Sequence, residues 1–204
     1  MGDVFYRFEE ELKEQSNVNN RYFLHGVLKH YYGEELIFAR DKVSKASCEI
    51  MSTNKILENF LMDQGVPVEK ERIREQFPGW TEVMIVNSEV VNKNIISWGN
   101  GGLTCAKLIE ITETDKKEFH NAIEAELEEL NGYCTAMLIY KKLQLKMNSF
   151  YKKNRIKNYV NLFYVLEHLF EDIYYFRMPH ILKEKQDKQF TTIDIIIKTI
   201  EDRK

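Results

Sequence analysis

Apolar residues recur every three or four positions along most of this chain, the spacing that places them on one face of an α-helix. Asparagine, serine and threonine precede several of these stretches, where their side chains can cap the first turn of a helix. Glycine and proline, which interrupt helices, are scarce, with 9 and 3 residues. The predicted helical stretches begin near Asp3, Asn19, Leu36, Ser52, Glu69, Glu113, Tyr133, Asn158 and Thr192. For the last stretch, the alternation of Ile193, Ile195 and Ile197 also fits a strand.

One stretch departs from the helical pattern and predicts a β-hairpin. Between Asn94 and Thr112, strand-forming residues flank the turn sequence Gly99-Asn100-Gly101-Gly102. Glycine and asparagine tolerate the positive φ angles that tight hairpin turns require. An isolated hairpin is at best marginally stable in water, so we expect it to pack against helices.

The segment from Thr81 to Asn94, just before the hairpin, is ambiguous. Thr81 can cap a helix that carries Val83, Val86, Val90 and Val91. The same density of β-branched residues favours a strand from Glu82 to Val86. Both alternatives stay open at this point.

These patterns predict a mainly α fold of the α+β class, with one small β-hairpin and long C-terminal helices. The chain shows no internal repeat and no long linker, so residues 1–204 are expected to form a single domain. Within it, residues 1–51 form a helical N-terminal layer, residues 52–112 contain two short helices and the hairpin, and residues 113–204 supply the C-terminal helices.

Composition bears on the cellular location of the protein and on the redox state of its cysteines. The net charge is −3, no run approaches the roughly 20 apolar residues that span a bilayer, and the N-terminus lacks a signal-peptide pattern. The three cysteines, Cys48, Cys105 and Cys134, are widely spaced, which fits reduced thiols. We therefore expect a cytoplasmic protein that does not associate with a membrane.

From Ser52 onward, the chain orders a helix, a proline-marked turn, a second helix, the ambiguous segment, the hairpin and a long helix. This order resembles the winged-helix transcription regulators of the MarR and PadR kind. The resemblance implies that Glu69 to Phe77 is a positioning helix and Thr81 to Asn94 a recognition helix. It also implies that Ile95 to Thr112 is the wing and that Glu113 to Arg177 builds a dimer interface.

A regulator of this kind would bind DNA as a homodimer, without catalysis. Glu82 and Glu89 oppose this function, and Lys107 is the only cation within the hairpin. An equally weighted alternative is therefore a hairpin that only covers a helical core. The resemblance places the DNA-binding residues at Asn87, Ser88, Asn92 and Lys93, with Asn100 and Lys107 on the wing.

A basic stretch follows an acidic one in the C-terminal half. It contains no acidic residue and is interleaved with aromatic residues, so it is a candidate patch for a nucleic-acid backbone or an acidic partner. The favoured alternative is a pair of solvated helix faces that attract each other. The basic residues are Lys141, Lys142, Lys146, Lys152, Lys153, Arg155 and Lys157.

The predicted helix from about Asn158 to Arg177 carries aromatic residues on more than one face. Such a helix is either central to the fold or buried in a partner. The second functional hypothesis is therefore a helical protein–protein interaction module, an adaptor or inhibitor, whose C-terminal helices bind a partner protein. The same surface would support homo-oligomerisation.

Catalysis has little support. His120 and Glu124 lie one helical turn apart, as metal ligands can, but neither belongs to a known metal-binding motif. No glycine-rich phosphate loop is present, because Gly99 to Gly102 precede a strand and not a helix N-terminus. We expect no catalytic residues, no metal and no cofactor.

Overall fold

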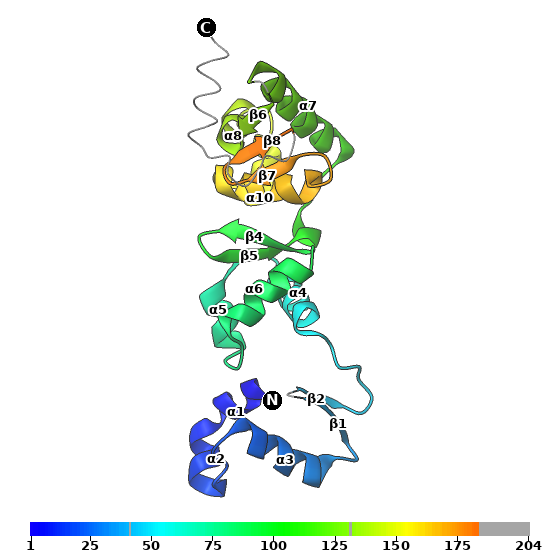
Figure 1. Ribbon diagram of the computed structural model, residues 1–204, viewed down its shortest axis with the longest axis vertical. Helices are drawn as coiled ribbons and strands as arrows, with labels where there is room; N and C mark the ends of the chain where they lie inside the picture. Colours follow the sequence, from blue (N-terminus) through cyan, green and yellow to red (C-terminus); the bar gives the residue numbers. More distant parts are fainter. Residues whose placement is uncertain (41, 131, 184–204) are drawn as a thin grey trace. The chain divides into compact units, whose positions relative to one another are not determined.

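The computed structural model describes residues 1–40, 42–130 and 132–183 (Figure 1), so the stretch predicted from Thr192 lies outside the described residues. It is 56% helical, with ten α-helices and small antiparallel sheets among the described residues, which confirms the predicted mainly α, α+β fold. Contacts gather into two compact units, where the sequence pattern suggested one. Unit 1 contains residues 1–95 and 100–104, and unit 2 contains 96–99 and the described residues from 105 onward.

The first part of unit 1 consists of three helices and a hairpin. The helical stretch predicted near Leu36 is wrong, because Leu36 to Lys45 form two antiparallel strands instead. Arg40 follows the first strand with a φ of 50°. Arginine has no preference for positive φ, so the sequence does not predict a turn at this position. The elements are α1 (Gly2–Arg7), α2 (Glu9–Ser16), α3 (Arg21–Tyr32), β1 (Leu36–Ala39) and β2 (Lys42–Lys45).

The second part of the chain, from Thr53, contains three helices and three short strands. The β4–β5 hairpin is confirmed, and Gly99, Asn100 and Gly101 at its turn all have positive φ. A third strand, β3, pairs with β5, so the sheet order is β3-β5-β4. The elements are α4 (Thr53–Gln64), β3 (Val68–Glu69), α5 (Lys70–Gln76), α6 (Glu82–Val91), β4 (Ile95–Gly99) and β5 (Gly102–Cys105).

The ambiguous segment is a helix. The Thr81 hydroxyl accepts a hydrogen bond from the Met84 backbone N–H and caps the first turn of α6. Ile85 and Ser88 of α6 are buried, and α6 packs on α4. This cap and this packing outweigh the strand preference of the valines.

Unit 2 combines a long acidic helix, three further helices and a second three-stranded sheet. Two of its boundaries differ from the prediction: β6 replaces the start of the helix expected at Tyr133, and a hairpin replaces the end of the helix expected to reach Arg177. The elements, after the 3-10 turn Ala106–Leu108, are α7 (Glu113–Glu129), β6 (Tyr133–Thr135), α8 (Ala136–Leu143), α9 (Asn148–Lys153), α10 (Tyr159–Phe170), β7 (Tyr175–Arg177) and β8 (His180–Leu182).

The same topology occurs twice along the chain. In residues 53–105 the order is helix, strand, helix, helix and hairpin, and in residues 113–182 it recurs with α9 inserted before the third helix. In both sheets the last strand is central and pairs with the first, giving β3-β5-β4 and β6-β8-β7. The repeat is therefore one of structure, and α10 occupies the place in the second repeat that α6 occupies in the first.

The core of unit 2 depends on a buried asparagine as well as on apolar side chains. The Asn154 side chain accepts a hydrogen bond from the Glu110 backbone N–H at 2.7 Å. It donates to the backbone carbonyls of Glu110 and Phe150 at 2.9 and 3.1 Å. Asn154 thus ties the segment that enters α7 to the end of α9.

We expect Asn154→Ala to lower the free energy of unfolding by about 2–4 kcal/mol, because it leaves buried backbone groups without partners. Chemical denaturation followed by circular dichroism measures this loss. The exposed Asn121 of α7 provides the control, since Asn121→Ala should change stability by no more than about 0.5 kcal/mol. Equal effects of the two substitutions would contradict the structural role of Asn154.

Candidate functional site

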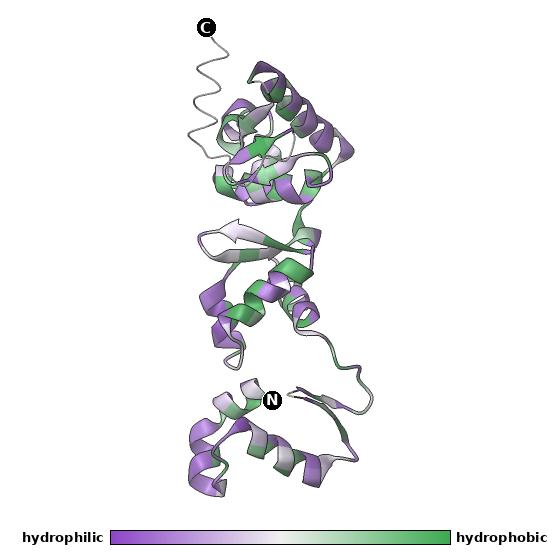
Figure 2. Ribbon diagram, in the orientation of Figure 1, coloured by the Kyte–Doolittle hydropathy of each residue, from purple (hydrophilic) through white to green (hydrophobic). Residues whose placement is uncertain are grey.

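The most distinctive surface of unit 1 is a stripe of exposed valines on α6, a helix that Figure 2 colours largely as hydrophobic. Val83, Val86 and Val90 lie at spacings of three and four residues, so they form one stripe along the helix. Their exposed fractions are 65%, 39% and 77%, and that of the neighbouring Val91 is 70%. Valine is a mediocre helix former, so this stripe does not serve helix formation.

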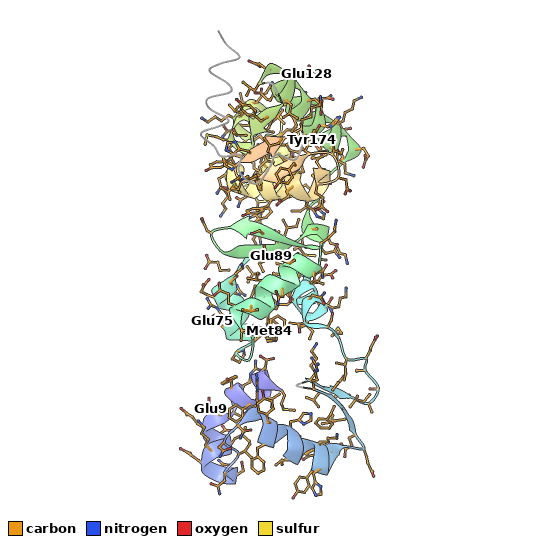
Figure 3. The ribbon with its side chains drawn as sticks, viewed as in Figure 1. Glu9, Glu75, Met84, Glu89, Glu128 and Tyr174 are labelled. Carbon is orange, nitrogen blue, oxygen red and sulfur yellow. The ribbon has the colours of Figure 1, made fainter. Side chains whose placement is uncertain are left out.

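A surface groove of about 270 Å³ runs beside this stripe, between α4 and α6. Its lining carries no charged residue, and Met84 and Val91 of α6 are its apolar members, with Thr53 of α4 on the other side. Figure 3 shows Met84 and Glu89 on α6. The polar residues that line the groove are Asn54, Asn87 and Ser88.

Two of the residues assigned to DNA contacts serve the fold. Ser88 is buried, and its hydroxyl donates to the Met84 carbonyl at 2.8 Å. Asn92 donates from its side-chain amide to the Glu58 carboxylate at 2.9 Å. Both side chains thus make hydrogen bonds within unit 1, and Ser88 is buried while Asn92 is partly exposed.

The Glu58 carboxylate is the centre of a polar network that ends α6. Glu58 is only 3% exposed. Besides Asn92, it accepts a hydrogen bond from the Asn94 amide at 3.2 Å and pairs with Lys55 at 3.3 Å. A buried carboxylate needs such partners, so the network fixes the turn between α6 and β4 onto α4.

The other four assigned residues are exposed but scattered. Asn87 lines the groove, Lys93 lies in the turn after α6, Asn100 is at the hairpin tip, and Lys107 is in the 3-10 turn after β5. Whether any of them contacts DNA stays a prediction.

Charge around α6 does not favour a polyanion. Between residues 52 and 112, acidic residues outnumber basic ones. Lys70 pairs with Glu89 at 3.4 Å, and Arg74 pairs with Glu71 at 2.8 Å. DNA affinity depends mainly on neutralising phosphates, so a surface whose cations are offset in this way is poorly suited to it.

The basic stretch of unit 2 faces the acidic residues that precede it. Lys142 pairs with Glu126 of α7 at 2.6 Å, and Lys153 pairs with Glu110 at 2.5 Å. A third ion pair joins Lys146 to Glu118. These contacts support the interpretation of mutually attracting helix faces. The remaining members, Lys141, Lys152, Arg155 and Lys157, are exposed.

The aromatic helix α10 is central to unit 2. Phe163 and Phe170 are buried in the main core, and Tyr159 and Tyr164 pack against it. The Asn161 amide of α10 also donates to the Trp98 carbonyl at 2.5 Å. The aromatic content that suggested a partner-binding helix is therefore used within the unit.

The His120–Glu124 pair, considered as a metal site, is joined by the hydroxyl of Tyr174; Tyr174 is labelled in Figure 3. The Tyr174 hydroxyl lies 2.7 Å from His120 Nδ1 and 2.6 Å from a Glu124 carboxylate oxygen. All three groups are satisfied if Nδ1–H donates to Tyr174 and Tyr174 donates to Glu124. Burial, followed by the hydrogen bond to Glu124, raises the pKa of Tyr174 above its ordinary value.

The remaining reactive or charged groups considered as chemical sites have structural roles in the described residues. Burial raises the pKa of Cys134 to about 12, which makes its thiol inert at neutral pH. Within the described ranges, no group of three or more His, Cys, Asp or Glu residues is arranged to hold a metal ion. A cavity of about 280 Å³ in unit 1 is lined partly by Asp3 and Lys42, which bind the Gly79 N–H and the Met51 carbonyl.

No family model, curated protein or solved structure matches this chain. Among the helices that the structure describes, none has both the length and the apolar character required to cross a membrane.

We expect Asn92→Ala to lower the free energy of unfolding by about 1–3 kcal/mol, because Glu58 would lose a partner in a buried site. Asn87→Ala, on the exposed face of the same helix, should change it by no more than about 0.5 kcal/mol. Urea denaturation of the two variants measures the difference. Equal stabilities would contradict the assignment of Asn92 to the fold.

We expect Tyr174→Phe to lower stability by about 1–2 kcal/mol at pH 7, since His120 and Glu124 lose their shared partner. The raised pKa of Tyr174 in the folded state stabilises the protein below the unfolded pKa of about 10, and this contribution disappears as pH rises above that value. Between pH 9 and 11, wild-type stability should therefore fall more steeply than that of the variant. Parallel pH profiles would contradict the hydrogen-bonded role.

Proposed function

We propose that this protein is a non-enzymatic interaction module, and that α6 with the α4–α6 groove binds an apolar helix face of another polypeptide. The observation that carries this proposal is the exposed valine stripe at Val83, Val86 and Val90. It lies on the helix that precedes the β4–β5 hairpin, where a DNA-binding protein of similar element order would present polar and basic residues.

The geometry supports a helix-in-groove mode of binding. Residues spaced by three, four and seven positions present one continuous face, as amphipathic partners require. Complete burial of a valine side chain contributes roughly 1.5–3 kcal/mol. Because Val83, Val86 and Val90 are 65%, 39% and 77% exposed, burying the rest of the stripe contributes about 3–5 kcal/mol, roughly half of the binding energy of a micromolar complex. Polar Asn54 and Asn87 at the groove can fix the position of the bound segment.

A DNA-binding regulator of the winged-helix kind is the second candidate. The order of helix, strand, helix, helix and hairpin, with β5 central in the sheet, favours it. The apolar face of α6 and the surplus of acidic residues between 52 and 112 oppose it. We therefore rank protein binding above DNA binding for this site.

A photo-crosslinking residue at position 86 tests the proposal in cells that produce the full chain. We expect a protease-sensitive, nuclease-resistant adduct that disappears when Val83→Asp and Val90→Asp are added, since these charges would have to be buried on binding. The same probe at Leu145, which is 93% exposed in unit 2, is the matched control and should give no adduct. Equal adducts at both positions, or none at position 86, would refute protein binding by α6.

A gel shift with random duplex DNA at about 50 mM salt distinguishes the second candidate, because backbone contacts dominate non-specific affinity. We expect no shift. A salt-sensitive shift that Lys93→Ala and Lys107→Ala weaken would favour DNA binding over protein binding at this face.

A further inference from the structure

We propose that α6 binds α6 of a second copy of this chain, packed antiparallel about a two-fold axis between the levels of residues 86 and 87. This inference rests on the proposed function, because it names the polypeptide that the valine stripe contacts. The helix is ten residues long, about 15 Å, so the contact extends along its whole exposed face.

The apolar stripe is self-complementary in this arrangement. A two-fold axis at the middle of α6 places Val83 of one copy opposite Val90 of the other, and Val86 opposite Asn87. Val83 and Val90, which are 65% and 77% exposed, thus cover each other twice, and the smaller contact between Val86 and Asn87 lies at the axis. A two-fold interface needs this property, since the same surface must match itself.

Charge at the ends of α6 favours the antiparallel direction. Glu82 is exposed in the first turn, and Lys93 is exposed in the turn that follows the helix. Antiparallel packing brings Glu82 of each copy toward Lys93 of the other, whereas parallel packing places like charges side by side. The helix dipoles also oppose each other only in the antiparallel pair.

The second structural repeat shows what a covered helix of this kind looks like. Every residue of α10, from Tyr159 to Phe170, is buried or partly buried. Part of its cover comes from β4, where the Asn161 amide binds the Trp98 carbonyl and Val160 lies close to Gly99. No segment in the described part of unit 1 gives the α6 valines such cover.

Sedimentation or light scattering of the full chain across concentrations up to about 100 µM tests the proposal, since a pair of ten-residue helices is a small interface and predicts micromolar affinity. We expect a concentration-dependent dimer of twice the 24.3 kDa chain mass. Val86→Asp should convert it to a monomer with an unchanged circular dichroism spectrum. Leu145→Asp, at the most exposed leucine of unit 2, is the control and should leave the dimer intact.

Charge reversal tests the direction of packing. We expect Glu82→Lys and Lys93→Glu each to weaken dimerisation several-fold, and the double variant to recover it, because the pairing is then restored with opposite polarity. A dimer that Val86→Asp leaves unchanged would overturn the proposal. A double variant whose loss of dimer affinity equals the sum of the two single losses would also overturn it.

The crosslink at position 86 separates this inference from the proposed function. An adduct of twice the chain mass supports both. An adduct of any other mass, with a monomeric pure protein, overturns the second-copy inference and leaves protein binding by α6 in place. The absence of a protein adduct overturns both.

Discussion

The requirement that short hairpins be held by a third strand governs both repeats of this protein. Strands of three to five residues cannot form a stable hairpin alone in water. In each sheet the last strand, β5 or β8, is therefore central and pairs with a strand that lies two or three helices earlier in the chain. This pairing joins each hairpin to the strand that follows the first helix of its repeat, β3 after α4 and β6 after α7.

Local patterns predict the helices and one hairpin, but not the other two. Gly99, Asn100 and Gly101 predict the β4–β5 turn, because glycine and asparagine tolerate the positive φ angles that the turn requires. The β1–β2 hairpin turns after Arg40, which adopts a positive φ without any such preference. The sheet pairings of β3 and β6 depend on partners more than thirty residues away, which no local pattern contains.

The sequence predicts that α6 exists as one of two alternatives, but it does not predict which face of the helix is exposed. Periodicity identifies the faces of α6 but not which face is covered when apolar residues occur on both, as with Ile85 and Val86. Ser88 and Asn92 look like surface residues, yet their hydrogen bonds are inside unit 1. The valines look like core residues, yet they are exposed. Only the packing of α6 on α4 shows which of these polar residues are buried and which of these valines are exposed.

The Glu58 network separates the residues that hold α6 in the fold from the residues of its exposed valine face. Asn92 and Asn94 secure the end of α6 through a buried carboxylate, while the valine face takes no part in that anchorage. Substitutions along the valine face can therefore accumulate without unfolding unit 1. Over evolutionary time, the exposed surface of such a helix can change while the scaffold beneath it stays the same.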